Sequence, residues 1–357
     1  MKIVDRYIFV KFMSAFFYAL ALLMLIIVVF DFSENVTRFM DYKISWVDII
    51  TKYYLNWLPP FFNLFIPLFA FISTIWFTSR LSSNNEIVAI LSGGVNFYRM
   101  VVPYLAGAIC IAILAIFMAN VIVPRANYNL QAFKAESMSR WSPTTSNFHI
   151  RNSTHSYIYV DRWSVAENKG YLFSYDVLGN QYAKYRITAR EIQYNDSLKI
   201  WRLTDYTKRH TNHLGEHLFR GATMDTIFNI TPLDLSKNDK ACQTMTYREV
   251  LKFIREDKEK GGGMSKFYIM EAHKRIANSL GTIIMTLLGL SIASRKNRRG
   301  VGVHLFIGIA FAFSFVFLQQ ISTVFSTEGG FSPALGVWMP NIIYCFICFF
   351  MVRTCQK

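Results

Sequence analysis

Long apolar segments divide this sequence, three of them before a polar stretch at residues 125–264 and three after it. A segment of about 20 mostly apolar residues is long enough to cross a hydrocarbon core about 30 Å thick. These segments lie at residues 12–30, 61–77, 101–123, 276–293, 301–325 and 337–352. The chain is therefore predicted to be an α-helical membrane protein with six transmembrane helices, three on each side of an inserted domain.

The distribution of charge predicts how the chain is oriented. The segments at 1–11, 79–100, 294–300 and 353–357 together hold eleven Lys or Arg and two acidic residues. The loops at 31–60 and 326–336 hold three basic and five acidic residues. Because basic loops stay on the cytoplasmic side, both termini are predicted to be cytoplasmic and the inserted domain to lie outside. The net charge of +15 is thus explained by membrane topology, and no nucleic-acid partner is expected.

The inserted domain has the alternating pattern of β-strands. Turn signals separate its strand-like runs, and short strands at near-even spacing are typical of an antiparallel sandwich or open barrel. An amphipathic helix is predicted after the strands at residues 246–260, and Gly261-Gly262-Gly263 then forms a flexible joint. The strand-like runs lie at residues 157–162, 171–177, 182–194, 198–208 and 216–228.

No catalytic, cofactor or metal site is predicted. The sequence contains neither a GxxxxGK[ST] phosphate loop nor a nucleophile elbow, and Cys345 and Cys348 have no second half-site. An alternative is a membrane-anchored enzyme that acts on lipid or cell-envelope polysaccharide, in which His213 and His217 approach each other. A second alternative is a structural or signalling membrane protein whose β-domain binds a peptide.

The loop after the second crossing contains a short helix, predicted at residues 83–93. Ser83 and Glu86 have the spacing of a capping box, and Gly93-Gly94 ends the helix. An isolated helix of this length is marginal in water, so it is expected to pack against another structure. Glu86 is either only a helix cap or an acid that pairs with a basic residue of a cytoplasmic partner. The apolar residues of this helix are Ile87, Val88, Ile90 and Leu91.

Several motifs resemble the lipopolysaccharide export permeases of the LptF/LptG type. Asp5-Arg6-Tyr7-Ile8 matches the start of the family, nearer the LptG-like form, and Asn85-Glu86-Ile87-Val88-Ala89 followed by Gly93-Gly94-Val95 resembles its coupling helix. In the second half, the matching motifs are His273-Lys274-Arg275-Ile276-Ala277, Leu288-Gly289-Leu290, Arg299-Gly300, Pro333 and Trp338-Met339-Pro340-Asn341.

The resemblance implies a fold and a set of partners. It implies that the inserted all-β domain is a periplasmic β-jellyroll and that the chain is a subunit of an inner-membrane exporter that extracts lipopolysaccharide. The implied partners are a cytoplasmic ABC ATPase dimer, a second homologous permease that completes a heterodimer, and periplasmic jellyroll bridge proteins. ATPase coupling is then expected at Glu86, Ile87, Ile90 and Leu91, and no substrate-binding residue is assigned.

The apolar segments and the polar stretch divide the chain into three parts. Residues 1–124 form the first three membrane helices and the coupling helix, residues 125–264 form the periplasmic domain, and residues 265–357 form the last three helices.

Gly281, Gly289 and Gly308 favour either close approach of helices between subunits or local kinks. Phenylalanines in the first and fifth helices, such as Phe16, Phe17, Phe313 and Phe315, either line an acyl-chain cavity or face lipid.

Overall fold

The chain forms two compact units, which are described separately. One unit contains Met1–Leu130 and Ile269–Lys357, and the other contains Gln131–Tyr268. The computed structural model describes residues 3–137, 145–153, 156–164, 168–178, 183–195, 198–212, 215–228, 230, 241–260, 265–294, 301–328 and 330–354.

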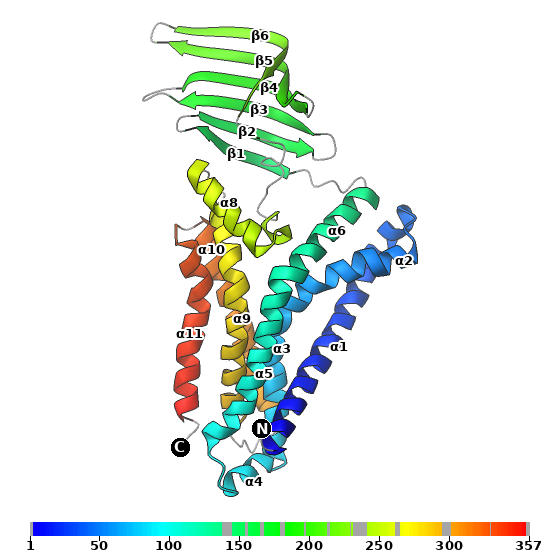
Figure 1. Cartoon of the computed structure of the whole chain (residues 1–357), viewed down its shortest axis with the longest axis vertical. Coiled ribbons are helices and arrows are strands. Elements are labelled where there is room, and N and C mark those ends of the chain that lie inside the picture. The colour runs from blue at the N-terminus through cyan, green and yellow to red at the C-terminus, as the bar shows by residue number, and fades with distance from the viewer. Residues whose placement is uncertain are drawn as a thin grey trace. The chain divides into compact units, whose positions relative to one another are not determined.

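The first unit is a bundle of helices that are long and apolar enough to cross a membrane. Six such helical stretches occur among the described residues, and each predicted apolar segment lies within one of them. The prediction of six crossings in a 3+3 arrangement is therefore confirmed. Their principal helices (Figure 1) are α1 (Ile3–Asp41), α3 (Leu55–Ser83), α5 (Phe97–Phe117), α9 (Ser265–Ala293), α10 (Val301–Glu328) and α11 (Pro333–Thr354).

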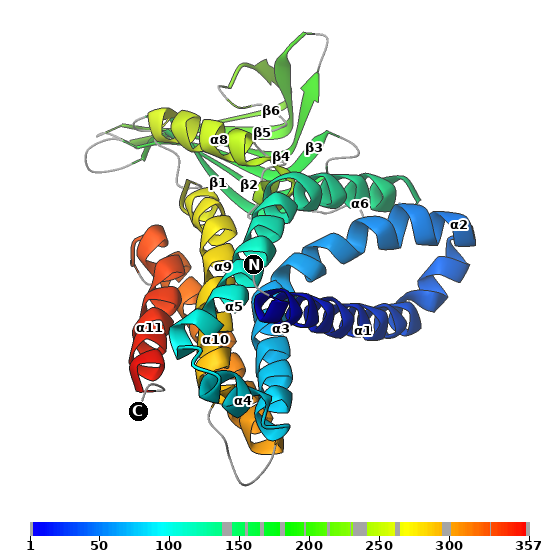
Figure 2. The same cartoon turned by 60° about the horizontal axis from the view of Figure 1, so that its bottom comes forward.

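Two of these crossings contain π-helical turns. The short helix α2 (Trp46–Asp48) and the π-helix η1 (Ile49–Tyr54) join α1 to α3, and Figure 2 shows them linking the far ends of both helices. In the third crossing, η2 (Met118–Ile122) connects α5 directly to α6 (Val123–Ser137). Because α5, η2 and α6 are continuous, the third helical stretch is longer than a crossing of the hydrocarbon core requires.

Helix α3 lies between two apolar clusters of the bundle. One cluster joins α3 to α1 and α5 and includes Phe12, Ile66 and Tyr104. The other joins α3 to α9, α10 and α11 and includes Phe71 and Phe315. Because α3 contributes buried residues to both clusters, it connects the N-terminal and C-terminal halves of the bundle.

Small polar residues on α3 add hydrogen bonds to this packing. The Thr78 hydroxyl donates to the Tyr104 hydroxyl of α5 over 2.9 Å, and the Ser79 hydroxyl lies 3.0 Å from Nδ1 of His304 on α10. Small side chains let membrane helices approach closely, and hydrogen bonds between helices fix their register. Thr78, Ser79 and His304 are buried.

The predicted glycines allow close approach of helices within this chain. A Cβ at Gly289 of α9 would lie 3.1 Å from the carbonyl oxygen of Phe71 on α3. A Cβ at Gly308 of α10 would lie 2.3 Å from Cδ1 of Ile75, also on α3. The sequence pattern favours close approach between subunits or local kinks, whereas these two glycines allow close approach to α3 of the same chain.

The second unit is built on one antiparallel sheet. Its strands pair in sequence order, so the predicted inserted antiparallel β-domain is confirmed. The described strands form an up-and-down meander, and the finer expectation of a jellyroll stays a prediction. The first strand was not predicted from the sequence. The strands are β1 (Thr145–Ser153), β2 (Ser156–Ser164), β3 (Lys169–Leu178), β4 (Ala183–Asn195), β5 (Ile200–Asn212) and β6 (Gly215–Thr226).

Alternation along the strands gives this sheet one apolar face. Trp163 and Trp201 are fully buried, and their rings meet edge to face with centroids 5.8 Å apart. The Trp201 indole N–H donates to the carbonyl oxygen of Ile230 over 3.0 Å, which satisfies the one polar atom of that side chain. Other buried residues of this apolar face are Ile158, Val160, Phe173, Ile187 and Leu203.

The other face of the sheet has ion pairs between neighbouring strands. Arg186 pairs with Asp176, and Arg202 pairs with Asp225 at 2.8 Å from Nε to Oδ1. The hydrogen bond from the Arg202 guanidinium holds the pKa of the Asp225 carboxyl below its usual value. Exposed pairs of this kind contribute little stability, but like the apolar alternation they fix the register of the strands.

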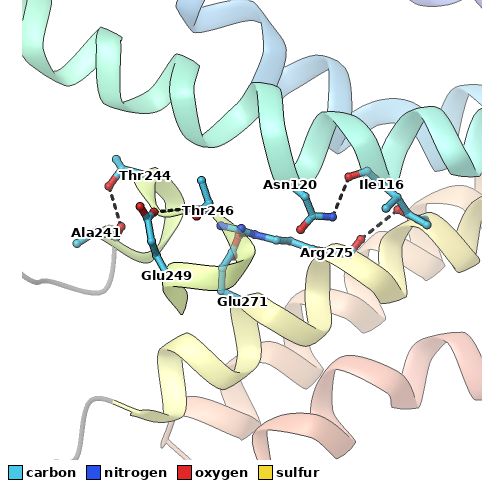
Figure 3. A network of polar contacts seen from close by, with 9 residues as sticks. Ile116, Asn120, Ala241, Thr244, Thr246, Glu249, Glu271 and Arg275 are labelled. Carbon is cyan, nitrogen blue, oxygen red and sulfur yellow. Dashed lines mark hydrogen bonds and ion pairs between the residues drawn. The ribbon is translucent and has the colours of Figure 1, made fainter. Parts of the chain in front are cut away.

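An amphipathic helix, α8 (Tyr247–Lys260), follows the sheet as predicted. Its first turn is capped by Glu249, whose carboxylate accepts from the Thr246 backbone N–H over 2.7 Å (Figure 3). Val250 and Ile254 are buried on its apolar side, and α8 contacts β1 within the second unit. The predicted triple-glycine joint lies outside the described residues.

We predict that close packing at Gly289 is needed for stability of the helical bundle. Gly289→Val should lower the free energy of unfolding by about 1–3 kcal/mol, because the added carbons meet backbone atoms that cannot move aside. The matched control is Gly302→Val, since nothing lies within 4 Å of a Cβ at Gly302. Thermal unfolding of the detergent-purified protein should show a lower midpoint for Gly289→Val alone. Equal midpoints would contradict the role assigned to this contact.

Candidate coupling site

The short helix after α3 is α4 (Glu86–Ser92), and its start differs from the prediction. Helix α3 continues through Ser83, whose hydroxyl donates to the Arg80 carbonyl oxygen over 3.0 Å. The predicted capping box between Ser83 and Glu86 is therefore wrong, because Ser83 is engaged in the last turn of α3. Asn85 is the N-cap residue and has the left-handed conformation, with φ of 60°, which Asn adopts more readily than most residues.

The end of α4 agrees with the prediction. Gly94 has φ of +81°, a conformation that favours glycine. Its N–H donates to the Leu91 carbonyl oxygen over 3.0 Å, and the Gly93 N–H donates to the Ala89 carbonyl oxygen over 3.1 Å. Helix α5 begins shortly afterwards, where the Asn96 side chain accepts from the Tyr98 N–H over 3.1 Å. Both ends of α4 are thus fixed by tight turns.

The apolar residues of α4 face two different environments. Ile87 is only 4% exposed and belongs to the cluster that contains Leu81 and Met100. Val88 is 50% exposed and Leu91 is 38% exposed, while Ile90 is half-buried. Ile87 therefore attaches α4 to its own bundle, and Val88, Ile90 and Leu91 form the apolar surface that α4 offers. Sequence periodicity did not separate these roles, because it gives no information on which side the bundle covers.

The Glu86 carboxylate is half-buried beside α1 and the end of α3. One of its oxygens accepts from the Asn84 side-chain amide over 3.3 Å. The other accepts from the Tyr7 hydroxyl of α1 over 3.4 Å. Both hydrogen bonds are long, so they orient the carboxylate and leave it able to accept a stronger donor such as a guanidinium group.

The N-terminal motif Asp5-Arg6-Tyr7-Ile8 holds α1 beside this site. The Asp5 carboxylate pairs with the Arg99 guanidinium of α5 at 3.3 Å, and Ile8 is buried at 1% exposure. Tyr7 contacts Glu86, as described above. Three of the four motif residues therefore connect α1 with α4 and α5, a role that sequence spacing alone does not reveal.

The motifs of the second half also contact one another. The Trp338 indole N–H of α11 donates to Nδ1 of His273 on α9 over 3.3 Å, and the Asn341 side-chain amide donates to the Ala277 carbonyl oxygen over 3.0 Å. Arg275 is buried and pairs with Glu271 one turn earlier on α9, with Nε and Oε1 3.1 Å apart (Figure 3). The hydrogen bonds of Trp338 and Asn341 fix α11 against α9, whereas the Arg275 pair lies within α9.

The histidines that kept an enzyme in consideration do not form a metal site among the described residues. No group of three or more metal-ligating side chains is found there. His210 and His217 lie opposite each other on β5 and β6, and His213 lies outside the described residues. Since the described residues place no third ligand with them, this pair of histidines on neighbouring strands is explained by the register of the sheet.

We predict that Ile87 contributes to the stability of the protein and that Val88, its neighbour on α4, does not. Ile87→Ala should destabilise the protein by roughly 2 kcal/mol, since it removes buried apolar atoms. Val88→Ala, one residue away and half exposed, should leave the unfolding midpoint within experimental error. Thermal unfolding of both purified variants checks this, and a Val88→Ala variant that unfolds as early as Ile87→Ala would refute the division of roles on α4.

Comparison with known proteins agrees with this arrangement of motifs. The profile of the lipopolysaccharide export system permease LptF/LptG family matches residues 6–354. The lipopolysaccharide export system permease protein LptG of Escherichia coli strain K12 is 21% identical over 309 residues, which cover 84% of each chain. The LptG protein of Escherichia coli O6:H1 matches to the same extent. The chain therefore belongs to the LptF/LptG family and is a permease, a multi-pass membrane transporter subunit of a lipopolysaccharide export system.

Proposed function

We propose that this permease extracts lipopolysaccharide from the inner membrane and passes it to a periplasmic bridge, with energy supplied by a separate cytoplasmic ATPase dimer. Membership of the family supports the substrate class, and the absence of a phosphate-binding loop from the sequence supports a separate motor. A second homologous permease completes the transmembrane part, as the family name LptF/LptG suggests. The proposal rests mainly on α4, because this short helix presents an acidic residue and an apolar surface at one end of the bundle.

The proposed orientation has both termini and α4 in the cytoplasm and the β-domain in the periplasm. Figure 1 supports the first part, because α1 begins and α11 ends at the end of the bundle where α4 lies. The sequence segments at this end hold eleven basic and two acidic residues. A membrane protein retains such basic segments in the cytoplasm. This orientation brings α4 to the side on which ATP is available.

The proposed coupling surface consists of Glu86, Val88, Ile90 and Leu91. An apolar patch with an acid at its edge fits a groove that contains a basic residue, because the apolar contact supplies affinity and the ion pair sets the register. Ile87 contributes by holding α4 to the bundle. Movement of the motor is then transmitted through α4 to α3, since only Asn84 and Asn85 separate the two helices.

The proposed contact with the periplasmic bridge uses the β-domain. Among the described strands, β1 and β6 each pair on one side only. An edge strand with unpaired backbone groups can accept a strand of another protein. The bridge would therefore extend this sheet, which is consistent with the bridge proteins being jellyrolls as the family resemblance implies.

We predict that Glu86→Ala abolishes ATPase association or lipopolysaccharide export and leaves membrane insertion intact. Removing an acid that pairs with a buried basic group costs about 2–5 kcal/mol of binding. The matched control is Glu34→Ala, which removes an exposed acid near the other end of α1. Co-purification of the ATPase with each tagged variant measures association, and complementation in cells measures export.

Normal export and complex yield for Glu86→Ala would reduce Glu86 to a structural role at the start of α4. A stronger test exchanges charges. Glu86→Arg combined with an acid in place of the facing basic residue of the ATPase should restore association, although each change alone abolishes it.

We predict that the β-domain and the α4 end of the bundle differ in access to an impermeant thiol reagent. Leu198 in the β-domain is 63% exposed, and Ser83 beside α4 is also exposed. In cells with a permeabilised outer membrane, Leu198→Cys should be labelled and Ser83→Cys should be labelled only after the inner membrane is opened. The opposite result would overturn the proposed orientation, and the parent protein corrects for its native cysteines.

A further inference from the structure

A cavity of about 400 Å³ lies between α1 and the last turns of α3, beside α4. Two stripes of side chains line it. Tyr7, Lys11 and Tyr18 come from one face of α1, at helical spacings of four and seven residues, and Trp76 and Arg80 come from α3 at a spacing of four. The cavity has the size of a site for a small molecule or a lipid headgroup.

The two cations of this cavity have the surroundings of an anion site. Lys11 and Arg80 are exposed, and neither forms an ion pair with a described acidic residue. The Arg80 guanidinium lies 5.7 Å from the centre of the Trp76 ring, a contact that holds it at the cavity wall. The one acid of the lining, Glu86, accepts hydrogen bonds from Asn84 and Tyr7.

The position of the cavity decides the kind of anion. Both Lys11 and Arg80 belong to membrane-spanning helices, at about two turns from the start of α1 and one turn from the end of α3. Long basic side chains at such depths reach toward the phosphates of the membrane surface. Tyr18 is 74% exposed and Trp76 is 42% exposed. They lie about two turns and one turn further into the crossings than Lys11 and Arg80, on the membrane side of the cations.

We propose that this cavity binds the phosphate of an anionic phospholipid from the leaflet on the α4 side. Lys11 and Arg80 hold the phosphate, the Tyr7 hydroxyl and the Asn84 amide lie at its border, and Tyr18 and Trp76 cover the glycerol and first methylene groups. The lining holds two cations, Lys11 and Arg80, and one carboxylate, Glu86. Its net positive charge favours a lipid with a net negative charge over a zwitterionic lipid, which is neutral overall. This proposal is independent of the proposed role of α4 in coupling.

The test is lipid titration of the detergent-purified permease complex, followed by native mass spectrometry. The probes are phosphatidylglycerol and phosphatidylcholine with identical acyl chains. The wild type should retain phosphatidylglycerol preferentially. Arg80→Ala and Lys11→Ala should each weaken this retention about fivefold, the effect of one basic residue near a membrane surface, and Arg80→Lys should keep most of it.

The chain offers a matched control in Arg353. It lies at the end of α11, is exposed, and contacts Phe349 four residues earlier with 4.9 Å between guanidinium and ring centre. Arg353→Ala thus removes the same charge and the same kind of ring contact away from the cavity. It should leave retention of phosphatidylglycerol unchanged, and each variant should elute and unfold like the wild type.

Three results would overturn the proposal. The first is equal retention of the two lipids by the wild type. The second is a loss in Arg353→Ala as large as the loss in Arg80→Ala, because the effect would then reflect net charge. The third is displacement of phosphatidylglycerol by inorganic phosphate at millimolar concentration, which would identify a site for a free anion.

Discussion

Close packing against α3 is the constraint on which the rest of the bundle depends. Between membrane helices the lipid provides no hydrophobic driving force, so contact area and hydrogen bonds hold them together. Thr78 of α3 contacts α5, and Ser79 and Ile75 of α3 contact α10. On the side of α9, Gly289 allows that helix to approach α3 closely. The buried Ser and Thr residues of α3 serve this purpose, since larger side chains would separate the neighbouring helices. A single helix with small residues on several sides thereby organises both halves of the chain.

The sequence predicted the crossings well because lipid imposes a strong requirement. Backbone groups in hydrocarbon must be satisfied within a helix, so a long apolar segment has one reasonable structure. The packing of these segments was not predictable, since apolar residues occur on all sides of each helix. Phe16 is buried within the bundle whereas Phe17 next to it is exposed, and Phe315 is buried whereas Phe313 is exposed. Composition alone left both explanations of these phenylalanines open.

Errors in the shorter elements have local physical causes. The capping box failed because Ser83 hydrogen-bonds within α3, and a pattern of four residues gives no indication that the preceding helix continues. Strand β1 was missed because Thr145–Ser153 lacks the regular apolar alternation of β2. It is assigned to the sheet by its pairing with β2. Gly93-Gly94 located the end of α4 correctly, but only the bundle itself distinguishes the buried Ile87 from the exposed Val88.

If α4 couples the motor to the bundle as proposed, its contacts connect that signal to several helices. Ile87 joins α4 to a cluster shared by α1, α3 and α5, while Asp5 and Arg99 connect α1 to α5 across the same end. A force on α4 therefore acts on three helices at once. Helix α3 carries it further, because its other side packs against α9, α10 and α11. Through these contacts both helical triplets are connected to one short helix, although sequence alone connects α4 only to α3 and α5.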